Sequence, residues 1–147
     1  MMKKILSSVT VIAVMMLVLP SCNKDKRDSA RLSGETYNIT SLTVNGTAMT
    51  SMPTLSFDDC DIYDESCIGH WKAGDGSTAD FYWQYRDGAE TFEIANISSI
   101  SSAATYEVIN YSGIYTVVNG DKDELELSSS ASTGYMGKAV TIKMARM

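Results

Sequence analysis

The sequence of 147 residues has one histidine, two prolines and three cysteines, and its 12 basic residues are outnumbered by 18 acidic ones. A single histidine excludes catalytic mechanisms and metal centres that need two imidazoles. The shortage of basic residues argues against a nucleic-acid-binding protein, which needs a positively charged stripe, and against charge-driven binding to acidic membranes. A glycine-rich phosphate loop and a Gly-x-Ser-x-Gly elbow are also missing from the sequence. We therefore expect a non-enzymatic protein with no cofactor and no nucleic-acid partner.

The first residues have the organisation of an export signal. Lys3 and Lys4 precede the uncharged segment Ile5–Leu19, within which Val11–Leu19 is continuously apolar. A basic start followed by a short apolar core is typical of a secretory signal peptide. A membrane-spanning helix needs about 20 predominantly apolar residues, and this core is shorter. We therefore predict that the segment directs export and is then removed.

The end of the signal segment resembles a bacterial lipobox. Leu19 stands three residues before Cys22 and the small residue Ser21 stands one residue before it, although Pro20 departs from the usual small residue. The resemblance implies that a lipoprotein signal peptide, residues 1–21, is cleaved off and that Cys22 is acylated. Two or more acyl chains anchor a protein stably to a membrane, so we expect a membrane-bound lipoprotein carrying palmitate-type chains.

The segment after the anchor is polar. Cleavage removes Lys3 and Lys4 and leaves 10 basic against 18 acidic side chains, a net charge of about −8. Residues 22–34 contain no aromatic residue, and Leu32 is their only large apolar one. We predict that this segment is a flexible tether, which spans ~40 Å when fully extended.

Three short signals concern the location of the mature protein. Asn23 is not the aspartate that commonly retains lipoproteins in an inner membrane, so we expect the outer membrane by analogy. The run 24–26 (Lys-Asp-Lys) matches acidic surface-export signals only halfway, which leaves periplasmic and surface-facing placements both open. The run 28–30 (Asp-Ser-Ala) resembles a three-residue O-glycosylation acceptor, which makes Ser29 a candidate modification site.

From Glu35 onward, short alternations of apolar and polar residues predict β-strands. A parity slip near Ser41 predicts a β-bulge, and the pairs 45–46, 87–88 and 119–120 (Asn-Gly, Asp-Gly, Asn-Gly) predict tight turns. We expect loops at 98–104 and 128–134. About nine runs, of which about eight are true strands, fit this pattern: 37–44, 54–59, 68–73, 80–86, 92–95, 106–109, 115–117, 125–127 and 140–145.

These strands predict an all-β fold. No run is flanked by a crossover helix, so parallel pairing is not expected. An antiparallel meander of eight short strands has two unpaired edges unless it closes on itself. We therefore predict an antiparallel, eight-stranded up-and-down barrel over residues 35–147, with a two-sheet sandwich as the alternative.

Two cysteines remain once Cys22 is assigned to the lipid. Cys60 and Cys67 stand at the mouth of a predicted hairpin, and an exported protein with two cysteines has one intramolecular disulfide available. Closing a loop of eight residues stabilises a fold by about 2–3 kcal/mol. We predict a disulfide between them.

The alternative for this region is a metal site, because His70 and the carboxylates of Asp58–Glu65 lie nearby. Zinc normally takes four Cys or His ligands at characteristic spacings, which are missing here. Calcium accepts carboxylates, but the run lacks the glycine and the ordered spacing of an EF-hand. We favour a solvated acidic loop without metal and a half-exposed strand position for His70, and keep weak calcium binding as the alternative.

The aromatic residues are the main clue to binding. A barrel of eight strands either fills its interior with side chains or holds one small ligand. The many large rings favour filling, while an aromatic-lined mouth stays an alternative. The candidate ligand contacts are Phe57, Trp71, Phe81, Trp83, Tyr85 and Tyr115.

The chain resembles small lipocalin-like domains of Gram-negative lipoproteins through its hydrophobic pattern and its cysteine pair, in the stretches 37–47, 55–60, 67–71, 81–83, 115–117 and 125–127. This resemblance implies an eight-stranded barrel that binds small apolar molecules. Two functions follow as hypotheses. The first is a lipid-anchored module that binds or carries a small hydrophobic ligand. The second is an envelope interaction protein with a filled barrel and an unidentified protein partner, acting through loops such as Asp58–Glu65 or Ser98–Ala104.

Overall fold

The computed structural model describes residues 24–61 and 66–147. The predicted signal peptide, the predicted lipidation site Cys22 and part of the acidic loop lie outside the described residues. None of the helices in the described part of the chain is long and apolar enough to span a membrane.

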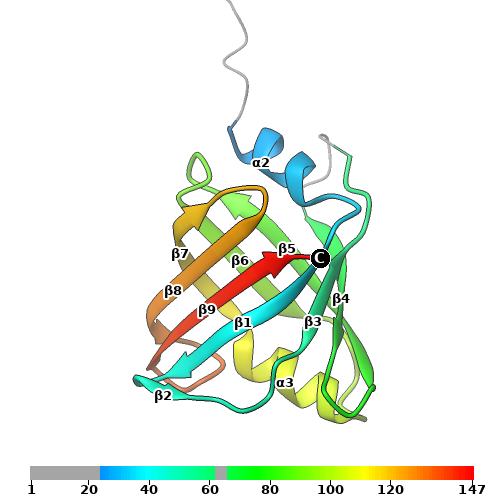
Figure 1. Ribbon diagram of the computed structural model, residues 1–147, viewed down its shortest axis with the longest axis vertical. Coiled ribbons are helices and arrows are strands. Elements are labelled where there is room, and N and C mark those ends of the chain that lie inside the picture. The colour runs from blue at the N-terminus through cyan, green and yellow to red at the C-terminus, as the bar shows by residue number, and fades with distance from the viewer. Residues whose placement is uncertain (1–23, 62–65) are drawn as a thin grey trace, which may run out of the picture.

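The described residues form an antiparallel sheet that closes into a barrel (Figure 1). From β3 onward each strand pairs with the next along the chain, and β1 pairs with both β3 and β9, which closes the barrel. The short β2 only extends the hairpin after β1, so eight strands form the wall. The predicted up-and-down barrel is therefore confirmed. The strands are β1 (Thr36–Val44), β2 (Thr47–Ala48), β3 (Thr54–Phe57), β4 (Cys67–Lys72), β5 (Thr78–Arg86), β6 (Thr91–Asn96), β7 (Gly113–Gly120), β8 (Glu124–Ser132) and β9 (Lys138–Arg146).

Local sequence signals explain the entry into the barrel. The register between β1 and β9 shifts between Ile39 and Ser41, which confirms the predicted bulge. Asn45 and Gly46 have φ angles of 47° and 77°, and these left-handed conformations suit the tight turn between β1 and β2. The bulge keeps Ile39 and Leu42 both buried, although they are an odd number of residues apart.

One helix lies across each end of the barrel (Figure 1). The helix α2 (Lys24–Leu32) lies across the end that carries the β5–β6 and β7–β8 connections. The helix α3 (Ala103–Tyr111) lies across the opposite end, between β6 and β7. Neither helix was expected from the sequence, which predicted a tether in place of α2 and a loop and a strand in place of α3.

The flexible tether predicted over 22–34 is wrong for residues 24–32, which form a helix with Leu32 buried in the core. The strand predicted at 106–109 is also wrong, because these residues lie in α3. The loop predicted at 128–134 is wrong up to Ser132, where β8 ends. The pair 119–120 belongs to β7, so the turn there occupies residues 121–123 and begins two residues later than predicted.

Candidate functional site

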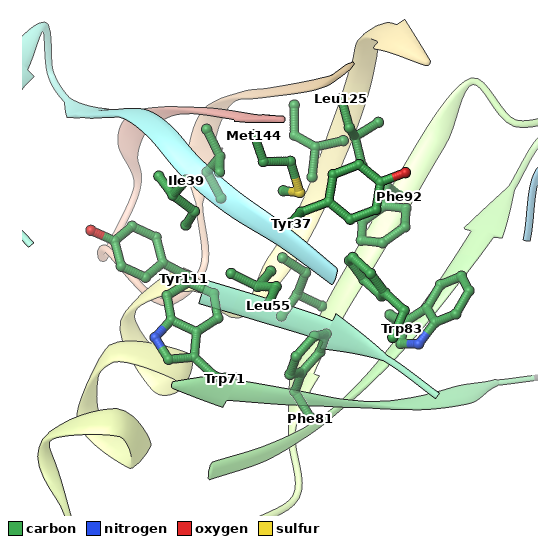
Figure 2. Close-up of a cluster of buried hydrophobic side chains, with 14 of the residues drawn as sticks. Tyr37, Ile39, Leu55, Trp71, Phe81, Trp83, Phe92, Tyr111, Leu125 and Met144 are labelled. Carbon is green, nitrogen blue, oxygen red and sulfur yellow. The ribbon is translucent and has the colours of Figure 1, made fainter. Parts of the chain in front are cut away.

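The predicted ligand contacts are all buried. Figure 2 shows three of them, Trp71, Phe81 and Trp83, among the side chains that fill the interior of the barrel. Phe57 is 1% exposed and forms the centre of this cluster. Its ring centroid lies 5.0 Å from that of Trp83 and 6.0 Å from that of Phe81, and both pairs are edge-to-face. Tyr37 and Phe92 complete the surroundings of Phe57 at 5.6 and 6.4 Å. At these separations rings are in direct contact, so side chains occupy the space around Phe57.

The α3 end of the interior is closed by polar contacts as well as by packing. The indole of Trp71 stacks on Tyr111 with ring centroids 5.3 Å apart, and its Nε1 donates to Glu107 Oε2 at 2.7 Å. Ser51 Oγ donates to the other oxygen of Glu107 at 2.6 Å. The Tyr115 hydroxyl donates to the Tyr111 carbonyl at 2.6 Å, and burial raises the pKa of Tyr115 to about 12. The helix α3 is thus held to the barrel by two neutral donors on one carboxylate.

The α2 end is open beside the helix. A groove of about 810 Å³ lies between α2, the β5–β6 turn and the rim formed by β7 and the β7–β8 turn. Burial raises the pKa of Tyr85, which lines this groove and is 7% exposed. Val117 and Ala89 add small apolar surfaces. The groove therefore adjoins the packed interior without entering it.

The charges around this groove, which we call the α2 groove, are mixed with a small positive excess. Lys24, Arg27, Arg31 and Lys122 line it, against the carboxylates of Asp28, Glu90 and Asp121. The net charge of the residues that line the groove is therefore about +1.

Asp28 holds two of these cations in place. Its Oδ1 lies 3.3 Å from both Arg27 Nε and Arg31 Nη1. The Asp28 side chain is 11% exposed, whereas the two arginine side chains are about half exposed. The guanidinium groups are therefore accessible from solvent, while the carboxylate that orients them is not.

The helix α2 is fastened at both of its ends. The Ala89 amide donates a hydrogen bond to Asp25 Oδ1, which joins the first turn to the β5–β6 turn. At the other end Leu32 is 2% exposed, and Ser33 Oγ accepts a hydrogen bond from the Cys60 amide at 2.7 Å. These contacts fix α2 against the wall of the barrel.

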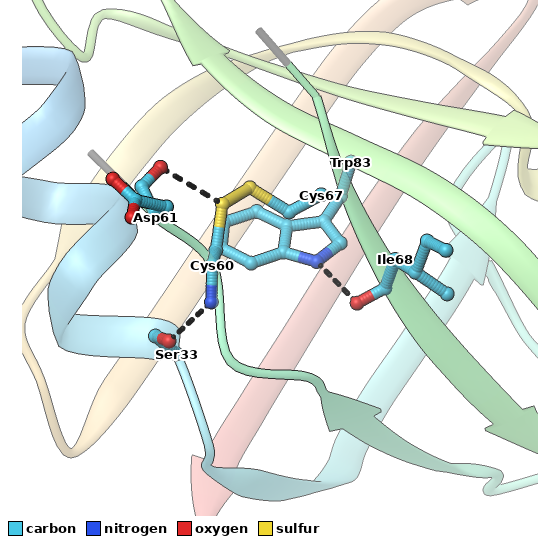
Figure 3. The surroundings of a disulfide bond; sticks show 6 residues. All are labelled: Ser33, Cys60, Asp61, Cys67, Ile68 and Trp83. Carbon is cyan, nitrogen blue, oxygen red and sulfur yellow. Dashed lines mark hydrogen bonds between the residues drawn. A yellow bond between two sulfur atoms is a disulfide. The ribbon is translucent and has the colours of Figure 1, made fainter. Parts of the chain in front are cut away.

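The predicted disulfide between Cys60 and Cys67 is present beside this attachment (Figure 3). Cys67 is buried and is the register partner of Trp83 on β5. Trp83 Nε1 donates to the Ile68 carbonyl at 3.0 Å, so its polar atom is satisfied at the barrel wall. The disulfide therefore ties the segment after β3 to the start of β4, and the Cys60 amide in this segment also donates a hydrogen bond to Ser33 at the end of α2.

His70 lies on the outer face of the barrel, half exposed as predicted, between two carboxylates. Its Nδ1 lies 2.7 Å from Asp80 Oδ1, and its Nε2 lies 3.0 Å from Asp58 Oδ1. The hydrogen bond with Asp80 raises the pKa of His70, with a further contribution from Asp58, against a lowering by partial burial. Since the two carboxylates approach opposite ring nitrogens, they do not converge on one metal position. In the described ranges no group of three potential ligands is placed to hold a metal ion.

The sequence reasoning identified the interior residues but missed the α2 groove. Arg27 and Arg31 stand one helical turn apart, a spacing that becomes meaningful only once the segment is known to be helical. Lys122 is brought to them by the closure of the barrel. Ser29, the candidate glycosylation site, lies within α2 and is partly buried.

Comparison with known proteins supports the fold. No family model and no curated protein matches the chain. A redesigned β-barrel aligns with a TM-score of 0.51 and 14% identity, over 82% of this chain and 96% of that one. A de novo designed fluorescence-activating β-barrel aligns with a TM-score of 0.49 and 15% identity, over 82% of this chain and 98% of that one. At such low identity the likeness to the redesigned barrel shows the fold alone.

Proposed function

We propose that the protein is a non-catalytic lipoprotein of the bacterial envelope, anchored to the outer membrane through acylated Cys22, whose barrel binds a small amphipathic ligand. The observation that carries the binding function is the α2 groove, a cavity of about 810 Å³ at the mouth of a closed barrel. Mouths of β-barrels are preferred positions for ligand sites. The lipocalin-like sequence pattern and the lipobox support the same assignment.

Because the interior is filled with side chains, we expect the ligand in the α2 groove and not among the interior rings. A ligand among Phe57, Phe81 and Trp83 has to displace rings that already contact one another. The α2 groove needs no such displacement. Its floor of Tyr85 and Val117 suits an apolar part, and its cationic rim suits an anionic group. A long-chain fatty acid combines these two features.

Native mass spectrometry of residues 23–147 with oleate tests this function. We expect a noncovalent adduct that the double variant Lys24→Gln/Lys122→Gln weakens several-fold. The matched control is Lys72→Gln/Lys138→Gln, which removes the same charge from exposed strand ends at the α3 side. Equal adducts in both double variants would place the ligand elsewhere, and no adduct with oleate or with an envelope lipid extract would refute a binding module.

A second candidate function is favoured by the outer face of the barrel. Ile68 and Tyr82 are register partners on β4 and β5, both 42% exposed, and Ile114 on β7 is 54% exposed. Exposed apolar side chains in register across strands are suited to a protein partner. A photo-crosslinker at Tyr82 in the native envelope should then capture a second protein, and recovery of monomer alone would count against this function.

A further inference from the structure

The predicted membrane anchor stands close to a rigid part of the molecule. Lys24, the first residue of α2, is two positions after Cys22. Two residues span at most ~7 Å. If Cys22 is acylated as proposed above, the acyl chains therefore start within a few ångströms of the first turn of α2.

The helix α2 is fixed to the barrel and does not act as a flexible linker between the anchor and the barrel. Asp25 accepts a hydrogen bond from the Ala89 amide, and Leu32 is buried in the core. The side chain of Asp28 is also buried, with its two arginine partners at 3.3 Å. A segment with these contacts cannot act as the ~40 Å extended tether that its composition predicts.

We propose that the α2 end of the barrel rests on the lipid headgroup layer, so that the α2 groove opens onto the membrane. The opposite end, closed by α3, then points away from the bilayer. This orientation rests on the proposed acylation of Cys22. It also extends the proposed binding function, because the membrane is then the source of the amphipathic ligand.

Many of the basic side chains lie in or beside α2. Four of the ten basic side chains that follow the signal peptide lie in α2, at Lys24, Lys26, Arg27 and Arg31. Lys122 adds a fifth at the groove. The groove carries a positive excess of about one charge, whereas the mature chain as a whole carries about −8. The carboxylates of Asp59, Asp87 and Asp123 lie at the same end of the barrel, so the orientation rests on the short distance between Cys22 and α2 and not on the net charge of this end.

Two matched positions allow the orientation to be measured. Val118 is 58% exposed on β7 near the α2 end, and Ile100 is 61% exposed just before α3. The ends are separated by roughly 20–25 Å, the length of a tilted strand of this size. A cysteine introduced at either position is the only free thiol, because Cys22 is acylated and Cys60 and Cys67 form a disulfide.

The experiment uses the acylated full-length protein in vesicles of phosphatidylethanolamine and phosphatidylglycerol that contain a headgroup-nitroxide lipid. A fluorophore is attached to Val118→Cys or to Ile100→Cys, and its quenching is recorded. We expect several-fold stronger quenching at position 118 than at position 100. Insertion of a flexible Gly/Ser segment of about twelve residues after Asn23, with a span of about 20 Å, should remove most of this difference.

Each result separates the orientation from the anchor. Equal quenching at both positions in a protein that carries acyl chains and floats with vesicles overturns the orientation and leaves the anchor intact. Stronger quenching at position 100 overturns it as well. A protein recovered without acyl chains, which does not float, overturns the proposed anchor and the orientation together.

Discussion

Truncation of Phe57 to alanine distinguishes a filled barrel from a lined cavity. Phe57 is 1% exposed and contacts four other rings. Removal of a buried phenylalanine side chain costs about 3–5 kcal/mol. Edge-to-face ring pairs contribute about 0.5–1.5 kcal/mol each beyond the buried area. We therefore expect the upper half of the range, about 4–5 kcal/mol.

Urea unfolding followed by tryptophan fluorescence measures this loss, since Trp71 and Trp83 both lie in the interior. A loss of this size is a large part of the ~5–15 kcal/mol that holds a typical domain together, so Phe57→Leu provides a milder variant with the same sign. Tyr82→Ala is the matched control, because Tyr82 lies on the outer face of β5 at 42% exposure. Its expected cost is below about 1 kcal/mol.

The cavity itself provides a second readout. The truncated ring leaves a dry apolar space, and engineered apolar cavities of about 150 Å³ in other proteins bind benzene. Benzene should therefore raise the stability of Phe57→Ala and leave that of the parent protein unchanged. A cost close to that of Tyr82→Ala, or an equal response of the parent to benzene, would refute the filled interior and restore the ring cluster as a ligand pocket.

Three further outcomes follow from the structure. Reduction of the Cys60–Cys67 disulfide should lower the free energy of unfolding by ~2–3 kcal/mol, measured by urea unfolding with and without a reductant, and no change would contradict a formed bond. His70→Gln should lower the free energy of unfolding by about 0.2–1 kcal/mol below pH 6.5, because the hydrogen bond with Asp80 raises the pKa of His70. The effect should vanish as the pH rises through the pKa of His70 in the folded protein. A loss of equal size at pH 5.5 and pH 8.5 would contradict this reasoning. Leu32→Ala should cost about 2–3 kcal/mol and expose the amides of α2 to hydrogen exchange, whereas α2 amides that stay as protected as the strands would show that Leu32 does not hold the helix.

The strand architecture could be predicted because its signals are local. Alternation of apolar and polar residues assigns each residue to one face of a strand, and a slip in that alternation marks the bulge at Ile39 and Ser41. The turn at Asn45 and Gly46 follows from the two residue types that best tolerate positive φ. Closure then follows from the lack of crossover segments.

The helix α3 could not be predicted by the same means because its composition favours strands. Thr105, Tyr106, Val108 and Ile109 are β-branched or aromatic residues, which have weak helix propensity. Helical spacing is nevertheless present, since Ala104, Val108 and Tyr111 are buried at i, i+4 and i+7. The N-cap Ser102, which accepts a hydrogen bond from the Thr105 amide, was the second available signal.

The helix α2 was missed for the opposite reason. Its nine residues are almost entirely polar, and its apolar anchor is the single residue Leu32. A helix this short is marginal in isolation. Its stability comes from contacts distant in the sequence, such as the one between Asp25 and Ala89 and the one between Ser33 and Cys60. A charge-rich segment therefore predicts a tether unless its partners are known.

The two ends of the barrel differ in the polar groups that remain available to a ligand. At the α3 end, Trp71 and Ser51 satisfy both oxygens of Glu107, and the ring of Tyr111 covers the indole. At the α2 end, Asp28 is buried but its two arginine partners remain half exposed beside a cavity. Satisfied and packed groups have no capacity left for a ligand, whereas exposed guanidinium groups retain donors for an anion. Because Cys22 is two residues before the first residue of α2, the proposed ligand site and the proposed membrane anchor lie at the same end of the barrel.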